Sequence, residues 1–313
     1  MRALVTGAAG FIGSHLCRRL VADGHDVVGF DDLSEGTLDN LADVPEVAFV
    51  EADLCDPEAV TRAGADRDVI FHQGAKRSVP RSLLEPVLTT QVNVLGTLNV
   101  FEAARASGAR VVYASSSSVY GDQDRFPLEE SMYPRPKSPY AASKLGDEAL
   151  GGAYWSSVGV PTVGLRYFNV YGPRQDPASE YAAVVPKFIM ACMDGNRPVI
   201  HGDGEQSRDF AYVDDVVQAN LLAAEAPEQA FGRAYNVGGG GEPTSVNDLL
   251  SIVAGLTDAS PDPIFEPARD GDMRMTMADL SQVRADLGHE PSVDIKAGLA
   301  RTVQWFQAAR ATA

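Results

Sequence analysis

A glycine-rich turn between an apolar strand and a helix is the feature that most limits how this chain can fold. Residues Ala3–Thr6 form a predicted buried strand, and a predicted helix over Phe11–Ala22 follows it. Between them stand Gly7, Gly10 and Gly13, in the spacing G-x-x-G-x-x-G. Glycines are needed in such a turn because its backbone approaches phosphate groups closely, while the helix N-terminus supplies free N–H groups. The turn therefore indicates an α/β fold that binds a dinucleotide.

The first half of the chain alternates short apolar runs with helical stretches, which is typical of a parallel sheet covered by helices. Further strands are predicted at Asp26–Phe30, Val47–Val50, Val69–His72, Arg110–Ala114 and Thr162–Arg166. Helices are predicted at Pro57–Gly64, Val87–Ser107 (ended by Gly108) and Tyr140–Ser157, with shorter ones near Pro186–Asp194, Val246–Gly255 and Leu280–Leu287. We expect a Rossmann-type doubly wound parallel sheet and, beyond Asn169, a smaller C-terminal α/β domain.

Composition argues against several classes of partner. The chain has 26 Lys and Arg against 43 Asp and Glu, a net charge of −17, whereas nucleic-acid binding needs clustered positive charge. No apolar run approaches the roughly 20 residues of a membrane-spanning helix. Cys17, Cys55 and Cys192 show no metal-ligand spacing and are expected to be reduced thiols of a cytoplasmic protein. We therefore expect no nucleic acid, membrane or metal.

Acidic residues end the second predicted strand and follow the third. Asp31 stands about 20 residues beyond the glycine turn, where a carboxylate accepts hydrogen bonds from ribose hydroxyls. Asp32 comes next, and no arginine nearby would neutralise a 2′-phosphate, so the pattern favours NAD over NADP. Asp53 and Leu54 either flank the adenine, or Asp53 caps the following helix.

A tyrosine, a lysine and a run of serines form the candidate catalytic set. Tyr140 and Lys144 are four residues apart, on one face of a predicted helix. Ser116 lies in the serine run that follows the strand Arg110–Ala114. A tyrosine phenol ordinarily has a pKa of about 10, and a neighbouring cation can lower it enough for the phenol to act as a base near neutral pH.

In this order, the motifs resemble the extended short-chain dehydrogenase/reductase family over nearly the whole chain, and in detail its UDP-glucose and UDP-N-acetylglucosamine 4-epimerases. Further matching segments are Leu165–Gly172, Arg208–Asp215 and Arg269–Asp272. The resemblance implies NAD as cofactor, a UDP-sugar substrate and a homodimer formed through the helices Val87–Ser107 and Tyr140–Ser157. It also implies an NAD-binding domain over 1–168, with a return segment near 210–237, and a UDP-sugar-binding domain over 169–209 and 238–313.

The resemblance assigns roles to individual residues. Tyr140 is the expected base and acid, Lys144 acts on Tyr140 and holds the nicotinamide ribose, and Ser116 contacts the sugar O4. Expected cofactor-binding residues are Gly7, Gly10, Phe11, Ile12, Gly13, Asp31, Asp32, Asp53, Leu54, Gly74, Asn93, Tyr140, Lys144 and Tyr167. Expected substrate-binding residues are Ser78, Ser116, Ser117, Tyr140, Asn169, Arg208, Arg269 and Thr276, with the two arginines on the diphosphate. His72 is expected to be structural.

Four positions bear on the reaction and the sugar. Ser117 and Ser118 stand where related 4,6-dehydratases carry an Asp-Glu pair, which favours epimerisation through a transient 4-keto sugar with no net consumption of NAD. Asn169 stands where uronate epimerases tend to carry Thr, which points to neutral sugars. Thr276 stands where epimerases strict for UDP-glucose carry Tyr, so it implies room for a 2-acetamido group unless it merely packs.

Two alternatives remain open. Lys76 and Arg77 place two cations near the expected sugar site, which is consistent with a UDP-glucuronate 4-epimerase. A non-enzymatic, NAD-sensing protein on the same fold would typically have lost Tyr140 or Lys144, and this chain keeps both.

Overall fold

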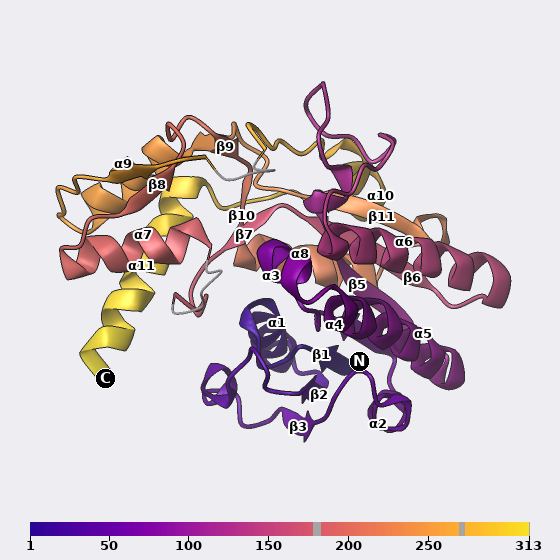
Figure 1. Ribbon diagram of the computed structural model, residues 1–313. Coiled ribbons are helices and arrows are strands. Elements are labelled where there is room, and N and C mark those ends of the chain that lie inside the picture. The colour runs from indigo at the N-terminus through magenta and orange to yellow at the C-terminus, as the bar shows by residue number, and fades with distance from the viewer. Residues whose placement is uncertain (178–182, 269–272, 313) are drawn as a thin grey trace.

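A seven-stranded parallel sheet forms the centre of the computed structural model, which describes residues 1–177, 183–268 and 273–312 (Figure 1). The strand order is β11-β6-β5-β4-β1-β2-β3. These strands are β1 (Arg2–Thr6), β2 (Asp26–Asp31), β3 (Ala48–Glu51), β4 (Val69–His72), β5 (Arg110–Ser116), β6 (Thr162–Tyr167) and β11 (Arg233–Val237). The direction of winding reverses between β1 and β4, and open α/β sheets bind ligands at the carboxyl edge beside such a reversal. The predicted Rossmann-type fold is confirmed.

Helices cover both faces of this sheet, and their apolar sides share a core with its strands. One face is covered by α1 (Phe11–Ala22), α8 (Val213–Ala224) and α10 (Ser281–Leu287). The other face is covered by α2 (Pro57–Gly64), α5 (Gly96–Ser107) and α6 (Pro139–Val158). Because both faces are buried, the strands read as nearly continuous apolar runs, which is why their positions could be predicted.

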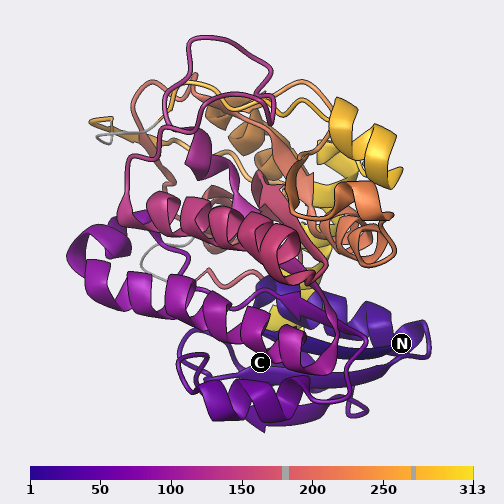
Figure 2. The same cartoon turned by 90° about the vertical axis from the view of Figure 1, so that its right-hand side faces the viewer.

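A smaller C-terminal part with its own apolar core lies beside the sheet, where Figures 1 and 2 show its orange and yellow segments together. Its helices are α7 (Val184–Asp194), α9 (Val246–Leu256) and α11 (Ile295–Thr312). It also contains three two-stranded sheets, formed by β7 (Asn169–Tyr171) with β10 (Phe210–Tyr212), β8 (Val199–His201) with β13 (Ile264–Glu266), and β9 (Ser207–Arg208) with β12 (Thr244–Ser245).

Short elements lie between the main ones, and one of them interrupts a predicted helix. They are η1 (Leu38–Leu41), α3 (Val79–Leu84), α4 (Pro86–Thr90), η2 (Gln91–Leu95), η3 (Ser117–Tyr120) and η4 (Glu228–Ala230). The helix predicted over Val87–Ser107 is in fact α4, a π-helical turn at η2, and α5. Such π-turns are frequent at functional sites. Gly108, at φ 76°, ends α5 as predicted.

Two long helices of the second half were not predicted. In α8, eight of twelve residues are buried, so the helix has almost no polar face and its periodicity is weak. In α11, Leu299, Val303 and Phe306 are buried at helical spacing, a signal that a closer reading of the sequence could have found.

Within the described ranges, no helix is both long enough and apolar enough to cross a bilayer. All three cysteines are free thiols, as predicted, and Cys17 and Cys192 are buried. Burial raises the pKa of the Cys17 thiol to about 12, so this side chain acts as an apolar core residue.

Two buried tyrosines in the sheet layer differ in how their hydroxyl groups are satisfied. Tyr113, on β5, is 1% exposed, and within the described residues its hydroxyl has no hydrogen-bond partner. Tyr120 is 0% exposed, donates to Asn236 Oδ1 at 2.6 Å and accepts from Arg166 Nη1 at 2.9 Å. The two side chains therefore form a matched pair for measuring the effect of an unsatisfied hydroxyl.

We expect Tyr113→Phe to raise the free energy of unfolding by about 1 kcal/mol, because it removes a buried polar group that has no partner. Tyr120→Phe should lower that free energy by about 1–2 kcal/mol, because it removes the donor to Asn236 Oδ1 and one of the acceptors of Arg166. Urea denaturation of the two variants and the parent measures both changes. Equal destabilisation by the two substitutions would contradict this account.

Candidate active site

The glycine turn after β1 is packed so closely that its glycines cannot be replaced without movement of the backbone. A Cβ atom on Gly13 would lie 2.0 Å from the carbonyl oxygen of Gly7. Gly7 has φ +67°, and a Cβ atom on it would lie 2.7 Å from the backbone nitrogen of Gly74. Gly10 is the N-cap of α1, and no side chain caps this helix. The first N–H groups of α1 are therefore available to an anionic ligand.

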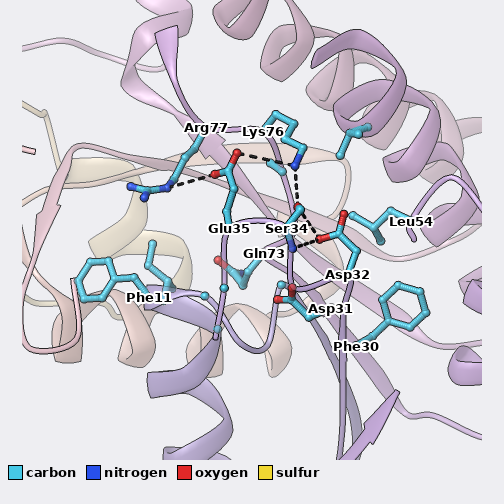
Figure 3. A pocket seen from close by; sticks show the side chains of 18 of the residues that line it. Phe11, Phe30, Asp31, Asp32, Ser34, Glu35, Leu54, Gln73, Lys76 and Arg77 are labelled. Carbon is cyan, nitrogen blue, oxygen red and sulfur yellow. Dashed lines mark hydrogen bonds and ion pairs between the residues drawn. The ribbon is translucent and has the colours of Figure 1, made fainter. Parts of the chain in front are cut away.

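A pocket opens over this turn, with walls from the carboxyl ends of the first four strands (Figure 3). Ten predicted cofactor-binding residues line it: Gly7, Gly10, Phe11, Ile12, Gly13, Asp31, Asp32, Asp53, Leu54 and Gly74. The sequence analysis missed Phe30, Ser34, Glu35, Gly36, Asn40, Ala52, Gln73, Ala75, Val92, Arg174 and Asp176, and it placed Lys76 and Arg77 only near the sugar. Most of the missed residues are in loops, where the sequence pattern carries no signal for a pocket.

The acidic residues of this pocket are held by backbone N–H groups. Asp31, buried at the end of β2, accepts from the N–H of Ala9 at 3.0 Å and of Leu33 at 2.9 Å, and burial raises its pKa. Asp53 accepts from the N–H of Cys55 at 2.8 Å, whereas α2 is capped by Asp56. The alternative that Asp53 caps this helix is therefore wrong.

Charged side chains connect the loops after β2 and β4 across the pocket (Figure 3). Glu35 lies 3.7 Å from Lys76 Nζ, 3.8 Å from Arg77 Nε and 3.3 Å from Arg81 Nη1. Lys76 Nζ also donates to Ser34 Oγ at 2.6 Å. Ion pairs between segments that are far apart in sequence could not be foreseen from the chain alone. They fix the loop that follows Asp31 and Asp32.

Four predicted cofactor-binding residues, Asn93, Tyr140, Lys144 and Tyr167, are not among the described residues that line this pocket. Buried in η2, Asn93 accepts from the N–H of Lys76 at 2.7 Å and donates to the carbonyl oxygen of Lys76 at 3.1 Å. Tyr167 is buried, and its hydroxyl donates to Gln73, which does line the pocket, at 3.1 Å. Asn93 and Tyr167 therefore support the loop that carries Gln73 and Lys76, from outside the pocket.

Tyr140 and Lys144 lie in the first turns of α6, which begins where β5 ends. Ser138 caps α6 by accepting from the N–H of Ala141 at 3.1 Å, and Pro139 is its first residue. Tyr140 is half-buried. Lys144 is 2% exposed, and its ammonium donates to the carbonyl oxygen of Ala114 at 2.9 Å. This bond ties α6 to β5 and fixes the height of Tyr140 above the sheet.

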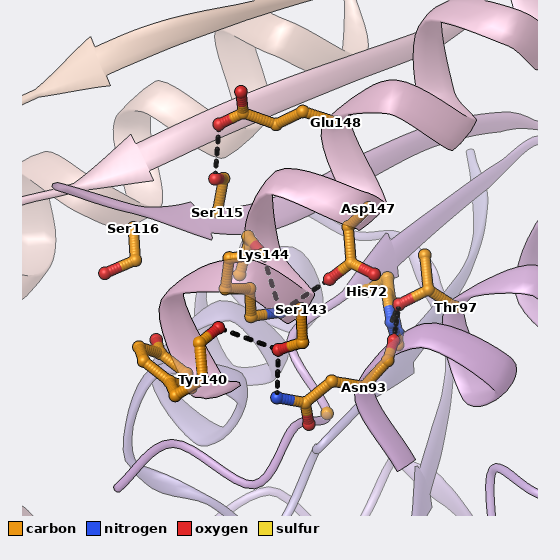
Figure 4. A network of polar contacts seen from close by, with 12 residues as sticks. His72, Asn93, Thr97, Ser115, Ser116, Tyr140, Ser143, Lys144, Asp147 and Glu148 are labelled. Carbon is orange, nitrogen blue, oxygen red and sulfur yellow. Dashed lines mark hydrogen bonds and ion pairs between the residues drawn. The ribbon is translucent and has the colours of Figure 1, made fainter. Parts of the chain in front are cut away.

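Ser116, the last residue of β5, lies near this helix start (Figure 4). Its Oγ accepts from the Ser118 N–H at 3.2 Å and from the Ser118 hydroxyl at 2.9 Å, and it caps η3. With both donors coming from Ser118, the Ser116 proton remains available to a ligand. Ser117 is half-buried in η3.

His72 is structural, as expected. It is 2% exposed, and its ring nitrogens are hydrogen-bonded to Thr6 at 2.7 Å and to Thr97 at 2.9 Å. Burial lowers its pKa to about 3, so the ring is neutral at physiological pH. A neutral, fully bonded imidazole in this place is not suited to move a proton to a ligand.

The expected substrate residues are distributed over several segments. Ser78 caps α3 and lines a second hollow next to the cofactor pocket. Asn169 is exposed at the start of β7, and its Oδ1 lies 3.5 Å from the hydroxyl of Thr276, which is 2% exposed. Arg208, on β9, is half-buried. Arg269 lies outside the described residues.

The class of protein follows from three features: the reversal of strand order, the glycine turn and the buried acid at the end of β2. Together they are the architecture of a Rossmann-type dinucleotide-binding protein. Ser116 of β5 and Tyr140 and Lys144 of α6 add groups that can exchange protons with a ligand, although none of the three is among the described residues that line the pocket over the glycine turn.

Comparison with known proteins identifies the family. The model of the NAD dependent epimerase/dehydratase family matches residues 3–238. A UDP-glucose 4-epimerase of Mycolicibacterium smegmatis is 44% identical over 98% of this chain and 99% of its own. A solved UDP-N-acetylglucosamine 4-epimerase from Methanobrevibacter ruminantium, in complex with UDP-N-acetylmuramic acid, has TM-score 0.93 at 38% identity and covers 98% of both chains. The chain belongs to the NAD-dependent epimerase/dehydratase family.

NAD is the cofactor of this family, and the residues of the pocket fit it. A Thermus thermophilus UDP-glucose 4-epimerase solved in complex with NAD has TM-score 0.90 at 39% identity, and covers 99% of this chain and all of that one. In this chain the Gly7–Gly13 turn leaves room for a diphosphate, and the carboxylates of Asp31 and Asp32 suit ribose hydroxyls. The cation closest to them, Lys76, is offset by Glu35.

The Glu35 ion pairs lead to a prediction about cofactor retention. We expect Glu35→Gln to weaken NAD binding about fivefold, because exposed ion pairs typically contribute up to about 1 kcal/mol. The dissociation constant for NAD, measured by fluorescence titration, checks the change. Glu85→Gln is the matched control, since Glu85 also pairs with Arg81, at 2.7 Å, but does not line the pocket. Equal losses in the two variants would count against this role of Glu35.

Proposed function

We propose that this chain is a UDP-hexose 4-epimerase, which acts on UDP-glucose and UDP-galactose and also on UDP-N-acetylglucosamine and UDP-N-acetylgalactosamine. The observation that carries this proposal is that Tyr140 and Lys144 lie four residues apart on α6, with Ser116 of β5 near the start of that helix (Figure 4). The names of the relatives from Mycolicibacterium and Methanobrevibacter support both sugar classes.

In the proposed mechanism, Tyr140 takes the proton of the sugar 4-hydroxyl and leaves a 4-keto sugar. NAD, when bound, would supply a reversible hydride acceptor for C4 of the sugar. The buried ammonium of Lys144 would stabilise negative charge that develops on Tyr140 during proton transfer, and it would hold the nicotinamide ribose. Ser116 would donate a hydrogen bond from its hydroxyl to the sugar O4. The keto sugar would turn over in the pocket, and Tyr140 would return the proton to O4 of the inverted sugar.

Two serines argue against the dehydratase half of the family. Elimination of water from the sugar needs an additional acid and base, and Ser117 and Ser118 occupy the positions where the dehydratases resembled by this chain carry a carboxylate pair. The Ser118 hydroxyl already donates to Ser116. Without a carboxylate in either position, the 4-keto sugar has no catalyst for elimination.

The substrate residues favour a neutral sugar with room at C2. Asn169 and Thr276 meet at the start of β7, and the Thr276 hydroxyl also accepts from the N–H of Asp209 at 3.2 Å. A threonine at this position is compact, which leaves space for an acetamido group. Arg208 and Arg269 are proposed to bind the UDP diphosphate, because the planar guanidinium group matches phosphate oxygens.

The case for a uronic acid substrate is weaker in the structure than in the sequence. Lys76 and Arg77, the two cations that suggested a carboxylate-bearing sugar, both pair with Glu35. Lys76 is further engaged by Ser34. A sugar carboxylate would therefore have to compete with Glu35 for either cation. A purely NAD-sensing role is also disfavoured, since Tyr140 and Lys144 are both retained.

We further propose the domain division stated above, with NAD held by 1–168 and 210–237 and the UDP-sugar by 169–209 and 238–313. A homodimer through the segment Val87–Ser107 and α6 is part of the same proposal. Exposed apolar side chains support it: Leu83, Leu84, Val87 and Leu95 lie exposed on α3, α4 and η2. Such clusters on a surface commonly mark a protein–protein interface.

Replacing the proposed base gives the most direct test of the function. We expect Tyr140→Phe to lower kcat for interconversion of UDP-glucose and UDP-galactose by at least about 100-fold, the usual contribution of general acid–base catalysis. NAD content and UDP binding should stay at parental levels. Tyr133→Phe, which alters an exposed tyrosine, serves as the control. Activity of Tyr140→Phe within tenfold of the parent would rule out the proposed mechanism.

The proposed sugar range is tested at Thr276. We expect Thr276→Tyr to lower kcat/KM for UDP-N-acetylglucosamine at least about tenfold more than for UDP-glucose, because a large side chain would occupy the space of the acetamido group. Thr276→Val, which keeps the size and removes the hydroxyl, should preserve the ratio between the two substrates. Equal losses for both sugars in Thr276→Tyr would mean that Thr276 only packs.

A further inference from the structure

Asp147 is a buried carboxylate beside the proposed catalytic lysine, and the mechanism above does not use it. It lies on α6, nearly one turn after Lys144, and its Oδ2 accepts from Lys144 Nζ at 3.1 Å (Figure 4). The side chains of Lys144 and Asp147 are 2% and 1% exposed. Removing the two charges of an ion pair from water to this degree costs free energy, which their mutual attraction offsets only when the geometry is good.

The three N–H bonds of the Lys144 ammonium limit where it can point. One donates to the carbonyl oxygen of Ala114 at 2.9 Å and one to Asp147. In the described part of the chain, the third has no hydrogen-bond partner. Since an ammonium group has three donors in a fixed tetrahedral arrangement, two anchored bonds determine the direction of the third. In the proposed mechanism, that remaining donor is the one that would serve the cofactor ribose and Tyr140.

Lys144 is the cation that pairs with Asp147. The other groups that act on this pair are Glu148 and the Thr97 hydroxyl, which act on Asp147, the buried Tyr113, on which Asp147 acts, and the neutral ring of His72, on which Lys144 acts. Glu148 is paired with Arg166 of β6 at 2.7 Å, so its charge is largely offset. Asp147 and Lys144 therefore act as a pair within this layer.

The hydrogen bonding of the Asp147 carboxylate is incomplete. Within the described residues, Oδ1 is buried without a hydrogen-bond partner. The nearby Thr97 hydroxyl donates to the carbonyl oxygen of Asn93 at 2.5 Å. Burial raises the pKa of Asp147 to about 6, against the lowering effect of Lys144. A carboxylate retained at such a cost, next to a functional lysine, calls for a role in the chemistry.

We propose that Asp147 is a positioning residue, which fixes the direction of the Lys144 ammonium and offsets part of the positive charge that Lys144 presents to Tyr140. This inference rests on the proposed function of Tyr140 and Lys144. It explains how one phenol can serve both half-reactions. A full, uncompensated positive charge would favour the phenolate so strongly that Tyr140 would return its proton poorly. A compensated charge keeps both proton transfers accessible.

The test uses Asp147→Asn in the NAD-bound enzyme, because asparagine keeps the shape and a hydrogen-bond acceptor while removing the charge. Loss of a negative charge roughly 10 Å or less from a phenol, at an effective dielectric constant of about 20, favours the phenolate by about one pH unit. We therefore expect the acidic limb of the kcat profile to move down by about one unit. Tyrosinate absorbance, taken as the difference from the corresponding Tyr140→Phe protein, should move by the same amount.

Two further variants separate positioning from structural damage. Asp147→Glu restores the negative charge. It should return the midpoint of the acidic limb of the kcat profile to within a few tenths of a pH unit of the parent. Glu130→Gln is the matched control, since Glu130 is also a partly buried carboxylate with an unpartnered oxygen, but accepts from the N–H of Asn236 on β11. Its midpoint should not move. An unshifted midpoint in Asp147→Asn, or an equal shift in Glu130→Gln, would overturn the inference.

The outcome is separable from that of the proposed function, and it does not depend on one variant folding. If Tyr140→Phe remains active, the proposed mechanism fails. If Tyr140 is essential but the Asp147→Asn midpoint is unchanged, only the inference about Asp147 fails. Should Asp147→Asn not fold, carbon NMR of the tyrosine-labelled parent replaces it. The Tyr140 signal must then show a step where Asp147 titrates, near pH 6, and absence of that step would overturn the inference.

Discussion

The hydrogen bond from the Lys144 ammonium to the carbonyl oxygen of Ala114 connects the helix that carries the proposed base to the end of a central strand. The ammonium is 2% exposed and Ala114 is half-buried, and a charge-assisted bond in such surroundings is strong. Ser138 and Pro139 start α6 at a fixed residue, so Tyr140 is always in its first turn. The position of the phenol therefore follows from one buried bond and one helix cap.

A second constraint acts on the cofactor side of the crevice. Backbone atoms of Gly7, Gly13 and Gly74 approach one another so closely that any side chain would displace them. The loop that carries Gly74 continues to Lys76, whose backbone is held on both sides by Asn93 and whose side chain reaches Ser34. Packing without side chains and hydrogen bonds from buried amides thus shape the pocket together. The residues proposed for the sugar side, Asn169 and Thr276, come from separate segments of the smaller C-terminal part.

Much of the sheet layer could be predicted from the sequence, because its strands are apolar on both faces and its turns carry glycine. The cofactor pocket was predicted where a motif marks it, as at Gly7 and Asp31. Prediction failed for loops, where Glu35 gains its role from cations more than 40 residues away. Prediction also failed for α8, which is buried on nearly all sides and so has no polar face to detect. Asn93 was predicted to lie in a regular helix, whereas it lies in a π-helical turn.

The sequence by itself determined the fold class, the dinucleotide turn and the pairing of Tyr140 with Lys144, since each of these depends on residues close together in the chain. Only the tertiary structure decided which charges meet. It brought Lys76 and Arg77 to Glu35, which removed much of the case for an acidic sugar. It also showed that Lys144 shares its buried site with Asp147. The physical reason is that local spacing fixes periodicity and turn geometry, whereas burial and long-range pairing set the energy of a charge, and these arise only when distant segments pack together.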